Sequence, residues 1–343
     1  MHVQWYPGHM AKAIRIMKED MKLIDVVIEL VDARIPSSSK NPEIDNLANN
    51  KSRVILLNKF DMADQKYTEA WKAYYEAKGY HVALVNSKSG NGVKQVQDVV
   101  TKACAAKIER DRKKGILNRP VRAMVVGIPN VGKSTFINSF TGKASTKTGN
   151  KPGVTKGKQW IRLNKNIELL DTPGILWPKF NDQTVGLRLA FIGSINDNIL
   201  NTTELAMELI LFLNKYYYGR LQKRYEIEIP ETINGLKDAS MVLELIALKR
   251  GCILKGALPD TDRAAIFVLD DFRNTRIGNI TLEFPKVRKE KIILNVENSN
   301  EEILTNEISE GIISKEEIST DDVSTDNIAT DNISTDDIST DNI

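Results

Sequence analysis

The sequence predicts an α/β fold, a mostly parallel sheet with helices on both faces, followed by a smaller, mainly helical domain and an acidic repeat tail. Three observations support this: apolar runs alternate with helical patterns in the first half, strand-like runs stop near residue 178, and a five-residue repeat ends the chain. A chain of 343 residues with 41% hydrophobic content is long enough for about two domains with buried cores.

Six apolar runs predict strands, and helical patterns lie between several of them. Strands separated by helices favour parallel pairing, because each crossover returns the chain to the same end of the sheet. We therefore divide the chain into residues 1–178, 179–285 and 286–343. The predicted strands are 26–31, 54–57, 81–85, 123–127, 160–163 and 167–170, and the predicted helices are 10–23, 68–78, 93–108, 133–140, 203–217, 239–249 and 261–272.

The tail carries an aliphatic residue at every fifth position from Ile303 to Ile343. This period places the side chains on no single face of a helix or a strand. A pentapeptide β-solenoid would have few coils and no cap, whereas low hydrophobicity and dense negative charge favour disorder. We expect residues 286–343 to be a linker and a disordered tail.

The net charge of +3 conceals an asymmetry. Residues 299–343 hold 13 acidic residues and one lysine, whereas the rest of the chain holds 47 basic and 32 acidic residues. A basic body with an acidic tail suits an RNA partner, although an ordinary solvated surface gives the same totals. The densest basic clusters lie in 12–22, 110–114 and 220–224, and the last follows three tyrosines that could stack on bases.

The two cysteines, Cys104 and Cys252, form neither a disulfide framework nor a metal-binding pattern. The sequence has no apolar run long enough to span a membrane and no signal-peptide core at its start. We expect a cytoplasmic protein with no membrane partner.

Residues 127–134, GIPNVGKS, follow a predicted strand and open a predicted helix, which is the context that a P-loop requires. Its backbone N–H groups would surround the β-phosphate, and Lys133 would reach the β- and γ-phosphates. The Ser134 hydroxyl would ligate Mg²⁺. The predicted phosphate-binding residues are Asn130, Val131, Gly132, Lys133, Ser134 and Thr135.

A second phosphate loop, DTPG, follows the strand at 167–170. The Asp171 carboxylate suits the role of holding Mg²⁺ through water, and the Gly174 N–H can meet the γ-phosphate. Between the two loops lies PGVT, in which Thr155 could close over Mg²⁺ only when the γ-phosphate is present. The predicted Mg²⁺ ligands are therefore Ser134, Thr155 and Asp171.

Two loops upstream of the P-loop predict recognition of guanine. In NKFD, Asp61 can accept from guanine N1–H and from the 2-amino group, which adenine does not offer. Asn58 would brace the loop, and the Lys59 stem would lie along the base. In Asn86-Ser87-Lys88 the Ser87 N–H could contact guanine O6. We predict GTP and GDP as ligands, which argues against a metabolic kinase.

In chain order the motifs are NKFD, NSKSGNG, GIPNVGKS, PGVT and DTPG. This resembles a translation-factor-type GTPase with rearranged order, a circularly permuted G domain. Roughly residues 1–285 resemble the ribosome biogenesis GTPase A family. The segments that carry this resemblance, besides the motifs above, are WYPGHMAKA, ELVDARIP, SSSKNP and DTPGILWPKF. Asn86 departs from the serine that many GTPases carry, and the tail lies outside the resemblance.

The resemblance implies a GTPase that acts in late maturation of the large ribosomal subunit and has an RNA-binding helical domain. It would bind the pre-ribosomal particle and its ribosomal RNA in the GTP state and leave on hydrolysis, stimulated by the subunit. We expect a monomer.

Many GTPases orient the attacking water with a glutamine after DxxG, but here that position is Ile175. The family resemblance places His9 near the γ-phosphate, where a neutral imidazole could orient water; a purely structural histidine is the alternative. Asn130 matches the position at which related GTPases coordinate K⁺, with loop bracing as the alternative. The missing glutamine also favours a rival function, an RNA-docking protein gated by GTP occupancy in which hydrolysis is incidental.

Overall fold

The computed structural model describes residues 5–116, 119–142, 159–163, 165–180 and 182–285. The predicted tail and the PGVT segment with Thr155 lie outside these residues. The described residues all belong to one compact unit, and the division of the chain near residue 178 stays a prediction.

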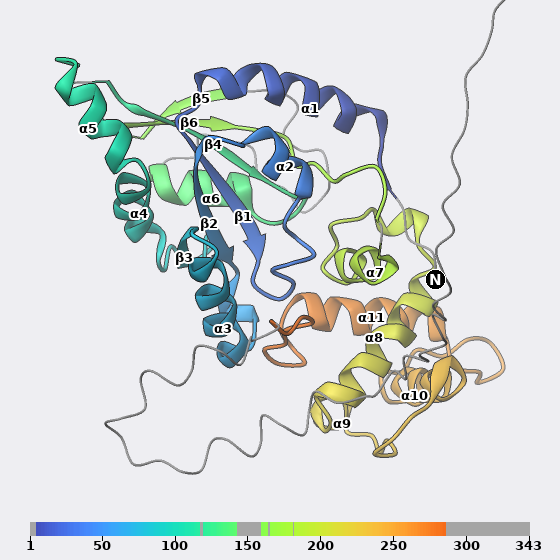
Figure 1. The fold of residues 1–343 in the computed structure, drawn as a ribbon. Coiled ribbons are helices and arrows are strands. Elements are labelled where there is room, and N and C mark those ends of the chain that lie inside the picture. The colour runs from blue at the N-terminus through green and yellow to red at the C-terminus, as the bar shows by residue number, and fades with distance from the viewer. Residues whose placement is uncertain (1–4, 117–118, 143–158, 164, 181, 286–343) are drawn as a thin grey trace, which may run out of the picture. The chain divides into compact units, whose positions relative to one another are not determined.

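The described strands form one six-stranded sheet in the order β3-β2-β1-β4-β6-β5 (Figure 1). All neighbours pair in parallel except β5, which lies antiparallel to β6 at the edge. The predicted mostly parallel sheet is thereby confirmed. The strands are β1 (Val26–Asp32), β2 (Ser52–Asn58), β3 (His81–Val85), β4 (Val121–Gly127), β5 (Gln159–Arg162) and β6 (Ile167–Asp171).

Helices cover both faces of the sheet. Ile55 and Leu57 of β2 pack into one apolar cluster with Trp71, whereas Leu56 packs into the larger core with Val96. A parallel strand covered on both sides needs a continuous apolar run, which is why β2 lacks alternation. The helices of this half are α1 (Gly8–Asp20), α2 (Pro42–Leu47), α3 (Gln65–Ala77), α4 (Val96–Ala103), α5 (Ala105–Lys113) and α6 (Lys133–Thr141).

The prediction of a single helix over residues 93–108 was wrong. The segment starts as a 3₁₀ turn at Val93–Gln95, and Cys104 then separates α4 from α5. Cys104 has φ −100° and ψ 6°, which breaks the regular helix, while its side chain stays buried. The helical periodicity continues through this bend, so the apolar pattern alone did not indicate it.

After β6 the described chain is helical, as expected. The α8 helix packs against both α10 and α11. The helices are α7 (Gln183–Phe191), α8 (Thr202–Tyr216), α9 (Arg220–Tyr225), α10 (Gly235–Lys249) and α11 (Thr261–Arg273). The short helices α2, α7 and α9 were not predicted.

One buried carboxylate, Asp271 of α11, connects three parts of this helical region. It accepts hydrogen bonds from Arg224 at 2.7 Å, Arg276 at 2.8 Å, Arg250 at 3.1 Å and the Tyr225 hydroxyl at 3.1 Å. Burial alone would raise the pKa of Asp271, but these hydrogen bonds outweigh it and lower the pKa to about 2. Asp271 is therefore ionised in the folded protein at neutral pH.

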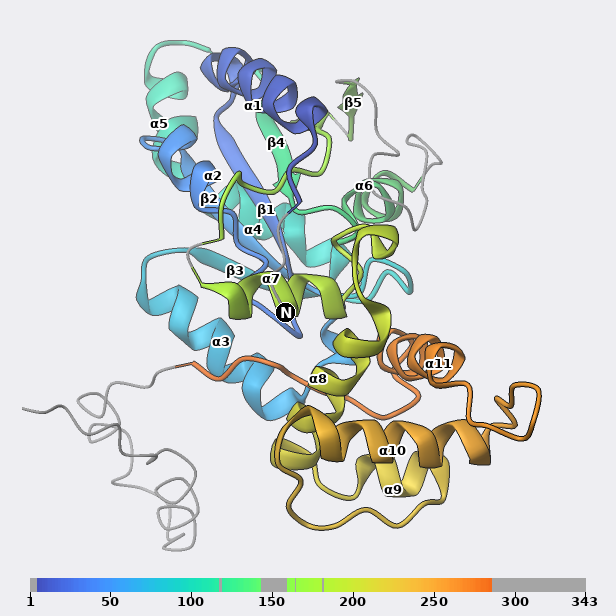
Figure 2. The same cartoon turned by 90° about the vertical axis from the view of Figure 1, so that its right-hand side faces the viewer.

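Beyond α11 the chain returns to the sheet-containing half. Figure 2 shows this stretch passing between α8 and α3. We call residues 279–283 the return segment. Its Ile280 N–H donates to the Met62 carbonyl at 3.2 Å, and its Leu282 N–H donates to the Arg34 carbonyl at 2.8 Å.

Candidate nucleotide-binding site

The predicted site loops lie at one edge of the sheet. Strands β1, β2, β3, β4 and β6 run in parallel, so their carboxyl ends share that edge. Asp32 at the end of β1 lies opposite Asn58 at the end of β2. The motifs therefore follow a permuted order along the chain. The loops that carry them nevertheless meet at the same edge of the sheet.

The P-loop connects β4 to α6 and depends on two glycines. Gly127 has φ +150°, and a Cβ there would lie 2.6 Å from the Leu30 carbonyl oxygen. Gly132 has φ +102°, and a Cβ there would lie 2.5 Å from Asn58 Nδ2. Both positions combine a backbone conformation that favours glycine with a close neighbour.

Lys133 opens α6 and is buried. Its Nζ donates to the carbonyl oxygens of Gly127 at 3.0 Å and Ile128 at 2.9 Å. Burial lowers its pKa to about 8, although the charge of Asp171 opposes that shift. Lys133 therefore remains mainly cationic at neutral pH and lies within the loop that would hold the phosphates.

Asp171 ends β6 and provides a test of the expected Mg²⁺ site. Burial raises its pKa to about 6, against the opposing effect of Lys133. Its Oδ1 is buried and accepts no hydrogen bond from the protein, so this oxygen is a suitable acceptor for a metal-bound water. Ser134 and Asp171 stay predicted Mg²⁺ ligands; a hydroxyl and a carboxylate are oxygen donors of the kind that Mg²⁺ prefers.

The described residues contain no group of three or more metal-ligating His, Cys, Asp or Glu side chains.

The DTPG loop touches the P-loop directly. A Cβ on Gly174 would lie 2.8 Å from Pro129 Cα and 2.9 Å from Lys133 Nζ. The next residue, Ile175, donates its N–H to the Gly127 carbonyl at 3.3 Å, and its side chain is fully buried. A buried alkyl side chain cannot orient a water, so another group must supply that function.

Asn58 connects the base-reading loops to the P-loop. Its Nδ2 donates to the Val131 carbonyl at 2.7 Å, and its Oδ1 accepts from the Ser87 N–H at 3.1 Å and the Ser87 hydroxyl at 2.8 Å. One carboxamide therefore contacts two of the loops expected around the nucleotide.

Lys59 makes a second connection. It has a left-handed backbone with φ +58°, and its Nζ donates to the Asn130 carbonyl and to Asp32, each at 2.9 Å. Arg34 also bonds Asp32, at 2.9 Å from Nε and 2.8 Å from Nη2. Burial alone would raise the pKa of Asp32, but Arg34 and Lys59 hold it well below its usual value.

Asp32 and Arg34 were missed as site residues. Both lie in the ELVDARIP motif that contributes to the family resemblance, but no spacing in the sequence linked Asp32 to Lys59.

Asp61 and Lys88 are exposed at this edge, and Asn86 is half-buried. Asp61 belongs to a 3₁₀ turn, Phe60–Met62, directly after Lys59. The Asn86 Oδ1 accepts from the N–H groups of Lys88 and Ser89, each at 2.9 Å, which closes that loop. The two loops leave the Asp61 carboxylate accessible to a base.

His9 is the second residue of α1 and is exposed. Its neighbour Met10 is buried, and the Met10 sulfur accepts the Leu176 N–H at 3.4 Å. The amino terminus of α1 is thereby held against the segment that follows DTPG. The position of His9 near the γ-phosphate and its catalytic role stay predictions.

Asn130 has a left-handed backbone, with φ +58°. Its Nδ2 donates to the Gly193 carbonyl at 2.6 Å, and the Ser194 hydroxyl donates to the Pro129 carbonyl at 2.8 Å. The turn after α7 thus bonds the P-loop. Sequence reasoning missed this turn, because Gly193-Ser194 belongs to no recognisable motif.

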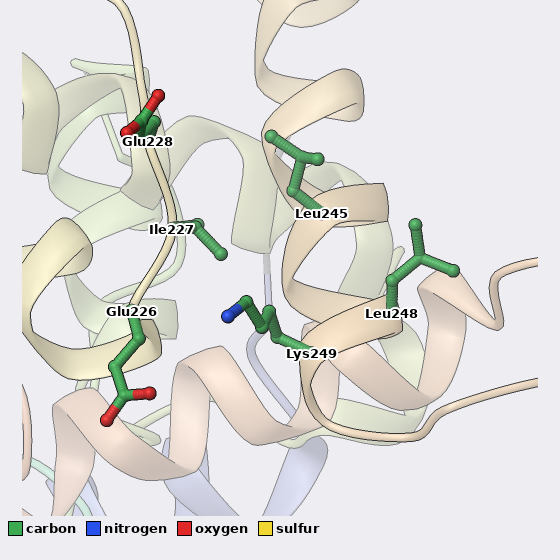
Figure 3. Close-up of a pocket in the computed structure, with 6 residues that line it drawn as sticks. All are labelled: Glu226, Ile227, Glu228, Leu245, Leu248 and Lys249. Atoms are coloured by element: carbon green, nitrogen blue, oxygen red, sulfur yellow. The ribbon is translucent and has the colours of Figure 1, made fainter.

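A cavity of about 520 Å³ lies elsewhere, in the helical region. Figure 3 shows residues 226–228 on one side and Leu245, Leu248 and Lys249 of α10 on the other. None of its lining residues belongs to the predicted nucleotide site.

The P-loop lies between a strand and a helix, and both the DTPG loop and the NKFD loop contact it. These features define a P-loop GTPase with a circularly permuted G domain. A family model described as 50S ribosome-binding GTPase matches residues 122–243. The chain is 48% identical to ribosome biogenesis GTPase A of Bacillus cereus, over 85% of this chain and 97% of that protein. It belongs to the ribosome biogenesis GTPase A family.

Other comparisons agree. Ribosome biogenesis GTPase A of Thermotoga maritima is 30% identical over 83% of this chain and 95% of its own length. A GDP-bound structure of TM YlqF superposes with a TM-score of 0.58 at 26% identity, covering 80% of this chain and all of the other. The structure of GNP-bound YlqF from T. maritima gives a TM-score of 0.56 at 27% identity, over 81% of this chain and 100% of that one.

The protein is therefore a GTP-hydrolysing, Mg²⁺-dependent enzyme of ribosome biogenesis. Among the described helices, none is both long and apolar enough to cross a bilayer.

Proposed function

We propose that this GTPase acts in late maturation of the large ribosomal subunit. It binds the pre-ribosomal particle in the GTP state and leaves on hydrolysis. The observation that carries this proposal is the contact of Gly174 with the P-loop, because residues 175–180 lead from there directly towards α7. A γ-phosphate that orders the DTPG loop would then also fix the pose of the helical region. The description of the matching family model, 50S ribosome-binding GTPase, supports the large subunit as the target.

Ribosomal RNA is the proposed contact of the helical region. The end of α8 and the start of α9 present exposed aromatic and basic side chains, and the Lys215 Nζ lies 5.2 Å from the centre of the Tyr216 ring. Aromatic rings can stack on bases while the cations contact phosphates. Arg224 is instead bonded to Asp271 at 2.7 Å. The proposed RNA-contacting residues are Lys215, Tyr216, Tyr218, Arg220 and Lys223.

Within the nucleotide site, Asp61 reads guanine N1–H and the 2-amino group. The Ser87 N–H, expected to contact guanine O6, donates to the Asn58 Oδ1 at 3.1 Å in the structure, so the proposed role of Ser87 is to brace the base-reading loop. Lys133 contacts the β- and γ-phosphates, and Ser134, Asp171 and Thr155 hold Mg²⁺, which when bound neutralises charge on the phosphate oxygens. His9 orients the attacking water through a neutral imidazole nitrogen. Asn130 coordinates K⁺ beside the phosphates. These assignments rest on residue type, position at the sheet edge and family membership.

The rival function, an RNA-docking protein gated by GTP occupancy, is favoured by the buried Ile175 at the position of the usual glutamine. The two functions differ in turnover. If hydrolysis is the working step, the particle should accelerate it; if occupancy alone matters, turnover stays slow on the particle.

The test is GTP turnover by the full chain with and without large-subunit particles, in K⁺ and in Na⁺. We expect stimulation by particles and by K⁺. Particle affinity is then measured with a non-hydrolysable GTP analogue and with GDP. We expect the GTP state to bind about 5- to 150-fold more tightly, the range of ordinary allosteric coupling. Equal affinities would show that the helical region is a passive anchor.

We propose the cytoplasm as the site of action, because ribosomal particles are assembled in that compartment, and a monomer as the working form.

A further inference from the structure

The return segment, residues 279–283, lies between the helical region and the guanine-reading loop. Ile280, Thr281 and Leu282 are at most 1% exposed. On one side, Thr281 and the Tyr217 hydroxyl at the end of α8 exchange two hydrogen bonds, at 3.0 and 3.1 Å. The backbone of the segment is therefore bonded to the helical region through the Tyr217 side chain.

The other side of the return segment bonds the loop after β2. The Asp64 N–H donates to the Thr281 hydroxyl at 3.0 Å, and the Ile280 N–H donates to the Met62 carbonyl at 3.2 Å. Asn279 adds a side-chain bond, from Nδ2 to the carbonyl oxygen of Asp61, at 3.0 Å. Three neighbouring residues thus hold the stretch that begins at Asp61.

The loop itself supplies few constraints on Asp61. Its own bonds are those of a single 3₁₀ turn, from the Met62 N–H to the Lys59 carbonyl and from the Ala63 N–H to the Phe60 carbonyl. Discrimination between bases, however, requires the carboxylate to be held to a fraction of an ångström. A bond to the carbonyl of Asp61 itself fixes the peptide plane from which that side chain projects.

We infer that Asn279 is a positioning residue for Asp61, supplied to the guanine-reading loop by the carboxyl-terminal end of the helical region. The inference rests on the proposed role of Asp61 in reading the base. It gives the helical region a direct contact with the guanine-reading loop. This contact is separate from the chain segment that connects DTPG to α7. Guanine affinity then depends on the helical region even in the absence of a γ-phosphate.

The experiment measures the affinities of the full-length protein for GDP and for inosine diphosphate, which lacks the 2-amino group. In Asn279→Ala one hydrogen bond is lost, and GDP affinity should fall about 2- to 12-fold. The affinity for inosine diphosphate should fall less, because Asp61 makes one contact fewer to that base. The isosteric Asn279→Asp faces the Asp61 carbonyl with an acceptor and should weaken GDP more than alanine does. Turnover at saturating GTP should stay the same.

Asn274→Ala is the matched control, because Asn274 is also exposed and bonds only Asp270 within the helical region. Its GDP affinity should match the wild type. Equal losses of both nucleotides in Asn279→Ala, or a milder effect of Asn279→Asp than of alanine, would indicate general loosening and overturn the inference. Asp61→Asn distinguishes a failure of the proposed role of Asp61 from a failure of the role of Asn279. If Asp61→Asn leaves GDP binding intact, Asp61 does not read the base. If Asp61→Asn weakens GDP binding and Asn279→Ala does not, only the positioning role of Asn279 is refuted.

Discussion

The side-chain nitrogen of Asn130 lies 2.6 Å from the carbonyl oxygen of Gly193, so the P-loop is hydrogen bonded to the turn after α7. The same carboxamide is the proposed K⁺ ligand. Asn130→Ala removes both the oxygen and the donor, and should abolish the K⁺ stimulation of GTP turnover. Asn130→Asp keeps an oxygen and should retain the stimulation.

Ser194→Ala is the control for the Asn130 prediction, because it removes only the bond from the Ser194 hydroxyl to the Pro129 carbonyl. Its ratio of turnover in K⁺ to turnover in Na⁺ should equal that of the wild type. Should Asn130→Ala keep that ratio as well, the asparagine only braces the loop.

His9→Ala should lower GTP turnover on the particle by roughly 10²- to 10⁴-fold, the scale of a positioned acid–base group. GTP affinity should barely change, since His9 contacts no predicted base or phosphate group. Single-turnover kinetics and nucleotide binding on the same samples separate the two effects. His81→Ala, at an exposed histidine that begins β3, should leave both unchanged. A fully active His9→Ala would leave His9 with a structural role only.

Asp61→Asn should weaken GTP and GDP by about 10- to 150-fold, because one of the two hydrogen bonds to a charged acceptor is lost while the amide oxygen can still accept the other. Xanthine nucleotides should gain affinity, since the asparagine amide can donate to their C2 oxygen. Equilibrium binding of guanine, xanthine and adenine nucleotides checks this. Asp98→Asn, an exposed change in the first turn of α4, should alter none of them. Equal wild-type affinity for ATP and GTP would refute base selection by NKFD.

Asp271→Asn should destabilise the protein by about 3 kcal/mol at pH 7, because it removes the buried charge that the surrounding arginines share. The folded pKa of about 2 lies below the ordinary value of 3.8. The carboxylate therefore stabilises the fold above about pH 4 and loses this effect as the pH falls towards 2. Denaturant unfolding from pH 7 downward should show the gap between variant and wild type closing over that range. Asp270→Asn, at the exposed neighbour, should show a much smaller gap.

Removal of residues 299–343 should strengthen non-specific RNA binding at low salt. The tail holds 13 acidic residues and one lysine, and it can compete with RNA for the basic body. The difference should shrink as salt rises, because salt screens both interactions. Titrations of the two proteins with unstructured RNA across a salt series provide the test. A tail with Asn and Gln in place of its acidic residues should behave like the deletion; if it behaves like the intact chain, charge is not the cause.

Local sequence signals were sufficient for the strands and for the P-loop. The GIPNVGKS motif contains its own strand end, turn glycine and helix start, so nothing distant is needed to place Lys133. The buried strands also show as apolar runs without help from their neighbours. The fold class followed from these local features alone.

The remainder depends on packing. The α2 helix has six residues, which is too short for helical periodicity to show. The contacts of Gly193 with Asn130 and of Asn279 with Asp61 span 63 and 218 residues of sequence. Both use ordinary turn residues, so only the folded chain reveals that they reach the nucleotide loops.

Asn58 bonds both Val131 in the P-loop and Ser87 near the base, and Gly132 leaves no room for a side chain between them. The loops proposed to hold the phosphates and the base are therefore bonded to one another before any ligand arrives. A nucleotide then acts as a bivalent ligand: once its diphosphate is seated, the guanine meets its own loop at a high effective concentration. Guanosine and pyrophosphate added as separate molecules lack this advantage, so each should bind far more weakly than its share of the GDP affinity.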